Sequence, residues 1–289
     1  MFRNGTVNIG KSLIQIPSSN VLIEKMKSLD ILAGQYFHAF YKKEWLGECE
    51  PAISELSIAE AYQVQNMVAR KRVQAGEKIV GYKIGCTSSA IRSQFGLTEP
   101  INGNLFQPHV FEANVVIDWS DYNHCAIEPE MVLKIGREIR GENLSDSELI
   151  DSVEYVSSGI EIHNFKFWNP PPTLQELICS GGIHAGLVVG SAKVSPRDLF
   201  FKDEVFYVYK DEVLVTSGPA SEIMGGPLHS LRWLVGFLTK KGLSLRKNSL
   251  VIPGSPVELV TVDQDTKLKV AVENVGSVVA FFKKHKKEF

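Results

Sequence analysis

From Ile79 to Phe282 the sequence is a series of short strand-like segments, and this series is the strongest constraint on the fold. The segments alternate apolar and polar residues or are rich in Val, Ile and Tyr, and turn residues such as Gly, Pro and Asn separate them. A chain with this pattern builds most of its core from β-sheet. The predicted strands are Ile79–Ile84, His109–Ile117, Ile127–Ile135, Ser158–Phe165, Ala185–Val189, Val205–Tyr209, Val213–Thr216, Ser249–Ile252, Lys267–Val272 and Gly276–Phe282.

Three local patterns join or interrupt these strands. Lys210-Asp211 lies between two alternating runs and predicts a hairpin turn. The segment from Ser145 to Glu148 is a capping box and predicts a helix over Leu149–Tyr155. Leu228–Thr239 has amphipathic helical spacing, so we expect a second helix there.

The part of the chain before Ile79 has helical spacing instead. Val21–Lys43 carries apolar residues at intervals of three and four. Ser57-Ile58-Ala59-Glu60 is a capping box that begins a second helix, and Gly76 ends it. We therefore expect an α+β protein with a small helical N-terminal region at residues 1–78 and a β-rich domain at residues 79–289.

Composition excludes several classes of protein. The 289 residues are 44% hydrophobic, which is enough for a large core and excludes a disordered chain. Lys and Arg total 31 and Asp and Glu total 33, so the net charge of −2 lacks the basic footprint of a nucleic-acid-binding protein. Apolar runs such as Val278–Phe282 are too short to span a bilayer. We expect no nucleic-acid partner and no membrane partner.

The cysteines and the first residues indicate the compartment. Cys49, Cys86, Cys125 and Cys179 are widely spaced and form no CxxC pair, which is typical of reduced thiols. Residues 1–20 lack the apolar core and cleavage site of a signal peptide. Together these features predict a soluble, cytoplasmic protein.

Glu128 and Glu130 flank Pro129 in a predicted strand, where side chains two residues apart point to the same face. Neighbouring carboxylates repel each other unless a cation or a proton lies between them, and Mg²⁺ and Mn²⁺ prefer such oxygen ligands. Glu161, in the otherwise apolar segment Ser158–Phe165, is a third candidate ligand. The same pattern also fits a solvent-facing strand edge at which Pro129 marks a bulge. Both interpretations stay open at this point.

Lys83 lies between strand-like residues and the small-residue turn that follows Gly85. A lysine in this position is a candidate anchor for an anionic substrate or a candidate acid or base. The alternative is an exposed lysine at a strand edge that discourages aggregation.

The remaining candidates lie near two histidines. His163 and His184 each have apolar neighbours, which is typical of structural histidines. Ser180 precedes Gly181 and Gly182, a pair that predicts a tight loop whose backbone N–H groups bind an anion. The sequence has no glycine-rich phosphate loop, GxSxG motif or HExxH motif, so nucleotide binding and the commonest hydrolase and zinc-protease mechanisms lose support.

Six segments, taken together and in order, resemble the 2-keto-4-pentenoate hydratase and 4-oxalocrotonate decarboxylase group of the fumarylacetoacetate hydrolase superfamily. The resemblance extends over roughly Val21 to Phe282. It is carried by Gly81–Ser88, Gly103–Phe106, Ile127–Leu133, Gly159–Ile162, Gly226–Leu228 followed by Trp233-Leu234, and Val251–Ser255.

This resemblance implies a mixed, rolled β-sheet of the fumarylacetoacetate hydrolase C-terminal type, with the N-terminal helices packed outside it. It also implies that Glu128, Glu130 and Glu161 hold Mg²⁺ or Mn²⁺ and that Lys83 lines the site of a small 2-oxo acid. Lys83 and His184 then become candidate catalytic residues, and Lys83 with Ser180 and Gly181 become candidate substrate-binding residues. Homo-oligomer formation is a further expectation from the family.

The chain departs from the family pattern at three places. Ile101-Asn102 precedes Gly103 where the family often has an acidic residue, Ser180-Gly181 replaces Asp-Asn, and His229 replaces Asn. An aliphatic Ile101 cannot transfer a proton. The metal half of the expected site is therefore intact, and the proton-handling half is altered.

Three functions are consistent with these residues. The first is a metal-dependent lyase that hydrates a 2-hydroxydienoate or a 2-oxo-enoate. The second is decarboxylation of a 2-oxo-enedioate, which needs an electron sink more than a general base. The third is a catalytically impaired relative that binds a ligand or a partner subunit. Hydrolysis of a C–C bond has less support because the sequence does not reveal a catalytic Glu–His pair.

Overall fold

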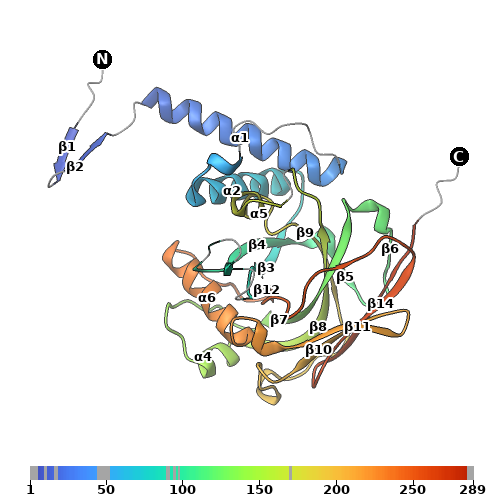
Figure 1. The fold of residues 1–289 in the computed structure, drawn as a ribbon. Coiled ribbons are helices and arrows are strands. Elements are labelled where there is room, and N and C mark those ends of the chain that lie inside the picture. Colours follow the sequence, from blue (N-terminus) through green and yellow to red (C-terminus); the bar gives the residue numbers. More distant parts are fainter. Residues whose placement is uncertain are drawn as a thin grey trace, which may run out of the picture.

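A curled sheet and a second, smaller sheet pack face to face beneath a layer of helices (Figure 1). The computed structural model describes residues 6–9, 12–15, 19–43, 53–88, 92–93, 96, 98–168 and 171–284. The helices of this part are α1 (Ser19–Lys42), α2 (Ile58–Gln74), α4 (Asp146–Ile150), α5 (Leu174–Cys179) and α6 (Pro227–Lys240). The strands are β1 (Thr6–Ile9), β2 (Ser12–Gln15), β3 (Ile79–Gly85), β4 (Ile101–Phe106), β5 (Val110–Glu112), β6 (Val116–Ile117), β7 (Cys125–Ile135), β8 (Val153–Asn164), β9 (His184–Val189), β10 (Val205–Lys210), β11 (Val213–Pro219), β12 (Leu250–Ile252), β13 (Val260–Thr261), β14 (Thr266–Val272) and β15 (Gly276–Phe282).

The larger sheet is eight-stranded and mixed. Its strand order is β4-β3-β12-β7-β8-β9-β5, and β13 pairs with β7 beside this path. The β12–β3 and β5–β9 pairs are parallel, whereas the long β7–β8 pair at its centre is antiparallel. Almost every residue of β7 is buried because the strand is covered on both faces. This is the curled, mixed sheet of the predicted α+β fold.

The smaller sheet has the order β11-β10-β14-β15-β6. Along β14 every second residue is buried, so one face of this sheet closes the main core and the other faces solvent. β10 and β11 form the predicted hairpin, but its turn residues are Asp211 and Glu212, both at positive φ, one position later than expected.

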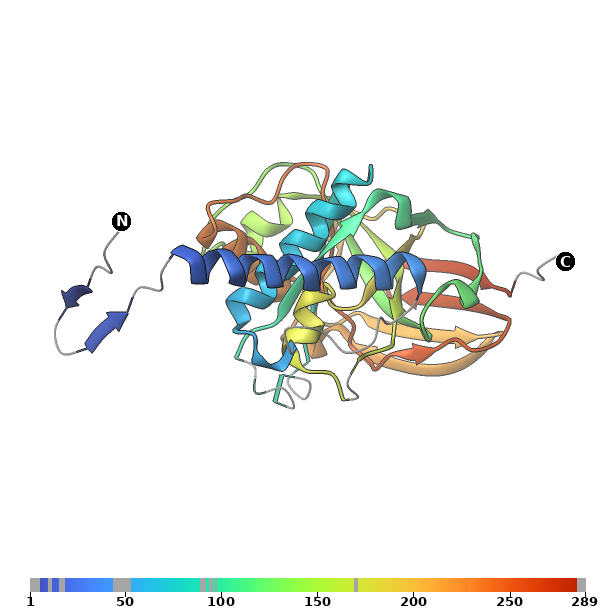
Figure 2. The same cartoon turned by 90° about the horizontal axis from the view of Figure 1, so that it is seen from above.

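Helices α1, α2 and α5 lie across the outside of the larger sheet (Figures 1 and 2). Leu32 and Ala33 of α1, Val64 of α2 and Ile178 of α5 belong to a second core cluster between these helices. The predicted capping box begins α2: the Ser57 hydroxyl accepts the Glu60 N–H, and the Glu60 carboxylate accepts the Ser57 N–H. The division at residues 78 and 79 coincides with the start of β3, and the two-domain assignment stays a prediction.

Two local predictions are wrong. The capping box at Ser145 and Glu148 is present, but α4 ends at Ile150 and the chain enters β8 at Val153. The expected helix over Leu149–Tyr155 fails because pairing with β7 determines the conformation of this segment. The expected strand His109–Ile117 is divided into β5 and β6, which belong to different sheets. Cys49 lies outside the described residues.

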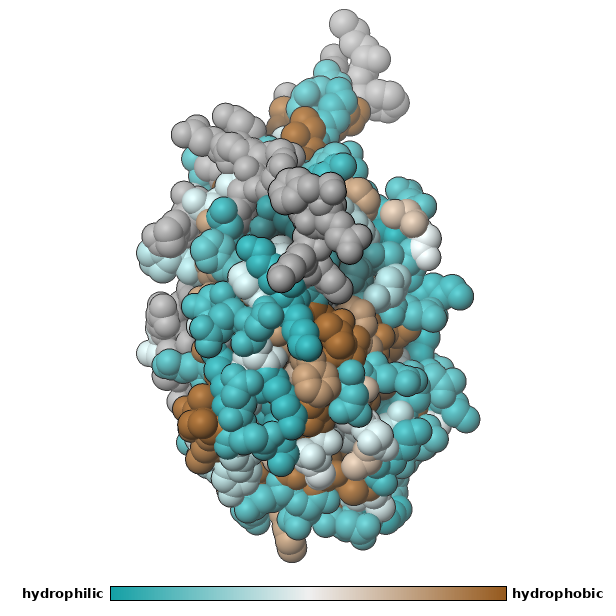
Figure 3. All heavy atoms as spheres, turned by 90° about the vertical axis from the view of Figure 1, so that its right-hand side faces the viewer, coloured by the Kyte–Doolittle hydropathy of each residue, from teal (hydrophilic) through white to brown (hydrophobic). Residues whose placement is uncertain are grey.

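The outer surface has modest apolar areas. Figure 3 shows one face, with a hydrophobic patch near its centre that hydrophilic side chains border. Within the described ranges, every helix is too short or too polar to cross a bilayer.

Candidate metal centre and substrate site

The pairing of β7 with β8 brings the predicted carboxylates together. In this antiparallel register Glu128 lies directly opposite Glu161, and Glu130 lies opposite Gly159 on the same face. The side chains of Glu130 and Glu161 are fully buried, and that of Glu128 is 22% exposed. The interpretation of Glu128-Pro129-Glu130 as a solvent-facing strand edge is therefore wrong.

Pro129 is accommodated by an interruption on the other edge of β7. That edge pairs with β13 at Ala126 and Ile127 and with β12 at Leu133 and Lys134. Pro129 lies between these two pairings, where the strand has no need of a backbone donor. The interruption also leaves space beside the carboxylates for the loop after β12.

Glu130 is held by this loop. Its Oε2 accepts the Gly254 N–H at 3.0 Å, whereas Oε1 has no hydrogen-bond partner among the described residues. Burial, together with the charges of Glu161 and Glu128, raises the pKa of Glu130 well above its usual range. The charged form of Glu130 is therefore disfavoured unless a cation lies beside it.

Glu161 is the most strongly contacted carboxylate of the group. Its Oε1 lies 3.0 Å from Lys83 Nζ and accepts a 2.8 Å hydrogen bond from His184 Nδ1. Burial alone would raise the pKa of Glu161, but Lys83 and the two neighbouring histidines outweigh it and lower the pKa. Oε2 of Glu161 has no hydrogen-bond partner in the described structure. This carboxylate is ionised and keeps one oxygen available.

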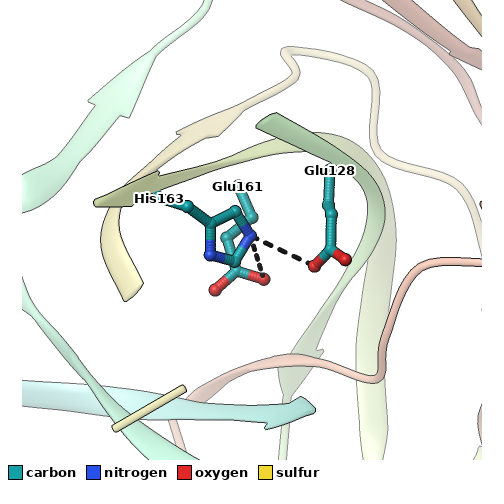
Figure 4. Close-up of side chains that lie close together, drawn as sticks. All are labelled: Glu128, Glu161 and His163. Atoms are coloured by element: carbon teal, nitrogen blue, oxygen red, sulfur yellow. Dashed lines mark hydrogen bonds and ion pairs between the residues drawn. The ribbon is translucent and has the colours of Figure 1, made fainter. Parts of the chain in front are cut away.

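His163 lies close to Glu128 and Glu161, and its ring contacts both carboxylates (Figure 4). One donor atom each from Glu128, Glu161 and His163 lies within 4.8 Å of the others. His163 Nε2 is 3.1 Å from Glu128 Oε2 and 3.5 Å from Glu161 Oε2. The apolar neighbours of His163 in the sequence predicted a structural histidine. The signal that identifies it is the two-residue spacing from Glu161, which puts both side chains on one face of β8.

Lys83 reaches the cluster from β3. Its side chain is 3% exposed, and its ammonium group contacts Glu161 and donates to the carbonyl of Gly182 at 3.2 Å. Burial lowers the pKa of Lys83, but the charges of Glu161 and Glu128 outweigh it, so the pKa is raised and the lysine stays charged. Gly182 has φ +71°, and a Cβ there would lie 3.2 Å from Nζ. Because Gly182 has no side chain, the Lys83 side chain can extend past it to the carboxylates. The interpretation of Lys83 as an exposed edge lysine is wrong.

His184 lies on β9 between the carboxylates and a narrow cavity. Its Nδ1 donates to Glu161, and its Nε2 has no partner among the described residues. The cavity is about 50 Å³ and is lined by His184, Ser180 and Arg72, among others. Burial lowers the pKa of His184 to about 4, so this imidazole is neutral. A neutral ring that donates through Nδ1 presents the lone pair of Nε2 to its surroundings.

Ser180 and Gly181 directly follow α5, and Ser180 is its C-cap residue. The Gly181 and Gly182 N–H groups donate to Ile178 and Leu177 at 3.0 and 2.8 Å. These donors close the helix end, so the prediction that this loop offers them to an anion is wrong. Ser180 lines the cavity beside His184. Gly181 lies against Gly103, and a Cβ added to Gly103 would come within 2.2 Å of the Gly181 carbonyl oxygen.

The donor set fits a divalent cation. Glu161 Oε2 and Glu130 Oε1 are buried without hydrogen-bond partners in the described part of the chain. Buried polar atoms of this kind are rare because each costs about 1–3 kcal/mol unless a partner binds it. Carboxylate oxygens and a neutral imidazole are the ligands that Mn²⁺ and related ions accept.

Sequence comparison finds relatives that are named as hydratases and as a decarboxylase. No protein-family model matches it. A TodF product hydratase from Pseudomonas putida is 27% identical over 232 residues, which cover 80% of this chain and 87% of the hydratase. A 4-oxalocrotonate decarboxylase from a Pseudomonas species is 26% identical over 223 residues, covering 77% and 86%. The chain is thus a homologue of proteins named as 2-keto-4-pentenoate hydratases and as a 4-oxalocrotonate decarboxylase.

Two solved structures show the same fold. The 4-oxalocrotonate decarboxylase from Pseudomonas putida G7, complexed with magnesium and adipate, superimposes with a TM-score of 0.84 at 24% identity, covering 89% of this chain and 98% of the decarboxylase. Fumarylpyruvate hydrolase from Pseudomonas aeruginosa, in complex with Mn²⁺ and pyruvate, gives 0.57 at 15% identity, covering 71% and 89%. The predicted fold of the fumarylacetoacetate hydrolase type is thus confirmed.

Proposed function

We propose that this homologue of the hydratase and decarboxylase group is a divalent-metal-dependent lyase that adds water to a small 2-oxo acid, a 2-hydroxydienoate or a 2-oxo-enoate. The observation that carries the proposal is the buried group of Glu128, Glu161 and His163, with the unpartnered oxygen of Glu130 beside it. The sequence similarity to hydratases supports the reaction type.

The cofactor would be Mg²⁺ or Mn²⁺. Glu128 and Glu161 would hold it, and Glu130 lies near enough to add its charge. When bound, such a cation polarises the carbonyl of a 2-oxo acid and stabilises the negative charge that develops on its oxygen. Solved relatives that contain magnesium or Mn²⁺ together with a small acid support this assignment.

Lys83 would bind the carboxylate of the substrate. Its ammonium group is buried, charged and 3.0 Å from Glu161, so it lies at the edge of the cation site. An anion that approaches the cation also approaches this ammonium group, and a buried charge–charge contact fixes its orientation.

His184 would move the proton that hydration requires. Its Nδ1–H is fixed by Glu161, which leaves the Nε2 lone pair directed away from the carboxylate. Ile101 is buried in the apolar cluster beneath α1 and α2, so this position holds no proton donor or acceptor. His184 is therefore our candidate for the function of the missing acid.

Decarboxylation of a 2-oxo-enedioate is the second candidate. Two observations favour it: the apolar Ile101, and the 26% identity to 4-oxalocrotonate decarboxylase. Loss of CO₂ requires stabilisation of negative charge but no proton abstraction, so the same cation site and Lys83 would be sufficient.

One assay distinguishes these reactions. Purified protein with Mn²⁺ or Mg²⁺ is given a 2-hydroxydienoate and, separately, its terminally carboxylated analogue, and ultraviolet absorbance and CO₂ release are followed. We expect metal-dependent consumption of the dienoate without CO₂, abolished by EDTA and by Glu128→Gln. CO₂ release from the carboxylated analogue alone would favour the decarboxylase. Metal binding without consumption of either compound would contradict both and indicate a catalytically impaired relative.

We also propose that the chain forms a homo-oligomer. The first two turns of α1 extend beyond the main body (Figures 1 and 2), and their apolar side chains are about half exposed: Val21 56%, Leu22 49%, Ile23 51% and Met26 49%. Contact with a second copy would remove this surface from water. Sedimentation velocity should show a species larger than 32.1 kDa, and a monomer at micromolar concentration would contradict the proposal.

A further inference from the structure

We propose that a cavity between α2, α6 and the β3–β4 pair is a second ligand site, and that it binds a planar aromatic carboxylate. The two helices flank these strands (Figure 1), and the cavity between them has a volume of about 490 Å³. This volume is within the range of pockets that hold small organic molecules. The inference goes beyond the proposed function and does not depend on it.

The β3–β4 pair separates this cavity from the cation site. In the antiparallel register Tyr82 pairs with Asn104, and Lys83 pairs with Gly103. Paired side chains share a face of the sheet and successive ones alternate, so Tyr82 and Asn104 face the cavity while Lys83 points to the carboxylates. Asn104 also borders a cavity of about 30 Å³ that reaches His184, but this space holds only about two water molecules. A ligand in the large cavity therefore stays apart from the proposed substrate.

The lining of the cavity carries positive charge without a counter-charge. It includes Arg70 and Lys241, and its described residues include no Asp or Glu. Neither cation belongs to an ion pair within the part of the chain that the structure describes. A concave surface with charge of one sign attracts a ligand of the opposite sign.

Two aromatic rings hold Lys241 in position at the cavity. Its Nζ lies 4.4 Å from the centroid of the Tyr62 ring and 4.0 Å from that of Phe237, and both rings line the cavity. These cation–π contacts restrict the positions of the ammonium group. Partial burial lowers the pKa of Lys241, so an anion bound beside it would stabilise its charged form.

The rest of the lining favours an organic anion over an inorganic one. The rings of Tyr62, Tyr82 and Phe237 offer apolar surface to a planar ligand. Amide side chains add hydrogen-bonding groups, among them Asn102, which is 5% exposed. Its Oδ1 has no hydrogen-bond partner among the described residues, which is rare for a buried polar atom. Cations, rings and amides around one cavity are the combination that recognises an aromatic carboxylate.

The test measures binding of benzoate to the full-length protein, with and without Mn²⁺, by saturation-transfer difference NMR. We expect saturable binding with a dissociation constant of about 1 mM or lower, and the same constant with Mn²⁺. Benzamide, which lacks the charge, and acetate, which lacks the ring, should bind at least about tenfold more weakly.

Variants locate the site. Arg70→Gln and Lys241→Gln should each weaken benzoate binding about tenfold, because each removes a cation from the lining. Lys240→Gln is the matched control: it removes the neighbouring exposed charge, which does not line this cavity, and should leave binding unchanged. Lys83→Met should also leave it unchanged, because Lys83 faces the cation site.

The outcomes distinguish this inference from the proposed function. Absence of saturable binding, equal binding of benzamide, or wild-type affinity in both Arg70→Gln and Lys241→Gln overturns the second site and leaves the metal-dependent lyase intact. Binding that requires Mn²⁺ or is lost in Lys83→Met would place benzoate at the cation site, which also overturns the inference. Circular dichroism verifies the folding of each variant, and Lys241→Met replaces Lys241→Gln if the latter unfolds.

Discussion

Two buried charged groups meet at the cavity lined by Arg72 and His184, and they differ in how completely their polar atoms are hydrogen-bonded. In the first, which we call the Arg72 group, Glu77 accepts a 2.6 Å hydrogen bond from Arg72, a 3.0 Å bond from His109 and a bond from Tyr41. In the second, the carboxylate cluster, Glu130 Oε1, Glu161 Oε2, His163 Nδ1 and His184 Nε2 are buried without hydrogen-bond partners.

This difference distinguishes a charged group that stabilises the fold from one that is available to bind a ligand. The Arg72 guanidinium lies between the rings of Phe40 and Phe106, 4.0 and 3.7 Å from their centroids, and joins α2 to α1 and β4. Among the described residues, none of the buried unpartnered atoms belongs to Arg72, Glu77 or His109. A group whose buried polar atoms are hydrogen-bonded stabilises the fold. A group with unpartnered oxygen and nitrogen atoms keeps those atoms available for a ligand.

The largest expected difference between the groups is in catalysis. Glu161→Gln should lower kcat/KM by about 10³-fold or more, about 4 kcal/mol, because the cation loses a charged ligand. Glu77→Gln should change kcat/KM by less than about threefold at a temperature where it is folded. Steady-state assays with Mn²⁺ and a 2-hydroxydienoate measure both. Equal losses in the two variants would contradict the distinction.

The next difference is in stability. Glu77→Gln should lower the free energy of unfolding by about 2–4 kcal/mol, because it leaves the buried Arg72 without its counter-charge. Urea denaturation of the metal-free protein measures the loss. The matched control is Glu212→Gln, which breaks an exposed pair with Lys267 and should cost less than about 1 kcal/mol. A loss at Glu77 as small as that of the control would show that the Arg72 group is not structural.

Removing Lys83 should affect metal binding in the opposite direction to removing a ligand. Lys83 Nζ lies 3.0 Å from Glu161, so its positive charge would repel a metal ion bound to the same carboxylate. Lys83→Met should therefore bind Mn²⁺ about tenfold more tightly, about 1.4 kcal/mol, while losing activity. Calorimetric titration checks the affinity. Weaker binding in this variant would mean that Lys83 organises the ligands instead of competing with the cation.

The smallest effect is a pH dependence of stability from Glu77. Burial raises the pKa of this carboxyl, but hydrogen bonds from His109, Arg72 and Tyr41 outweigh it and lower the pKa from 4.5 to about 2. The folded state thus gains stability above pH 4.5 and loses it as the pH falls toward 2. The stability difference between wild type and Glu77→Gln should narrow by about 1 kcal/mol between pH 5 and pH 3. A constant difference would show that Glu77 keeps its ordinary pKa.

Local signals in the sequence predicted much of the fold. The capping boxes at Ser57 and Ser145 depend on contacts within four residues, so the sequence pattern alone identifies them. The segment after Ile150 follows long-range pairing with β7 instead, and there the helix prediction failed. The two-residue period of Glu128 and Glu130 correctly placed both carboxylates on one face.

The rest of the site depends on contacts that local patterns do not contain. The position of Glu161 opposite Glu128, and of Lys83 beside it, follows from strand register, and the family resemblance supplied this grouping. His163 was predicted to be structural because its apolar neighbours on β8 are typical of such a histidine, whereas the structure places it beside Glu128 and Glu161. The N–H groups of Gly181 and Gly182 were misjudged because the sequence does not show that they close α5.

The most direct test of the central claim is a calorimetric titration of metal-stripped protein with Mn²⁺, carried out in parallel on wild type, Glu161→Gln and Glu77→Gln. If the unsatisfied carboxylate cluster is the cation site, wild type and Glu77→Gln will bind one Mn²⁺ per chain with similar affinity, and Glu161→Gln will bind at least about tenfold more weakly. Equal binding in all three proteins, or none in the wild type, would contradict the claim.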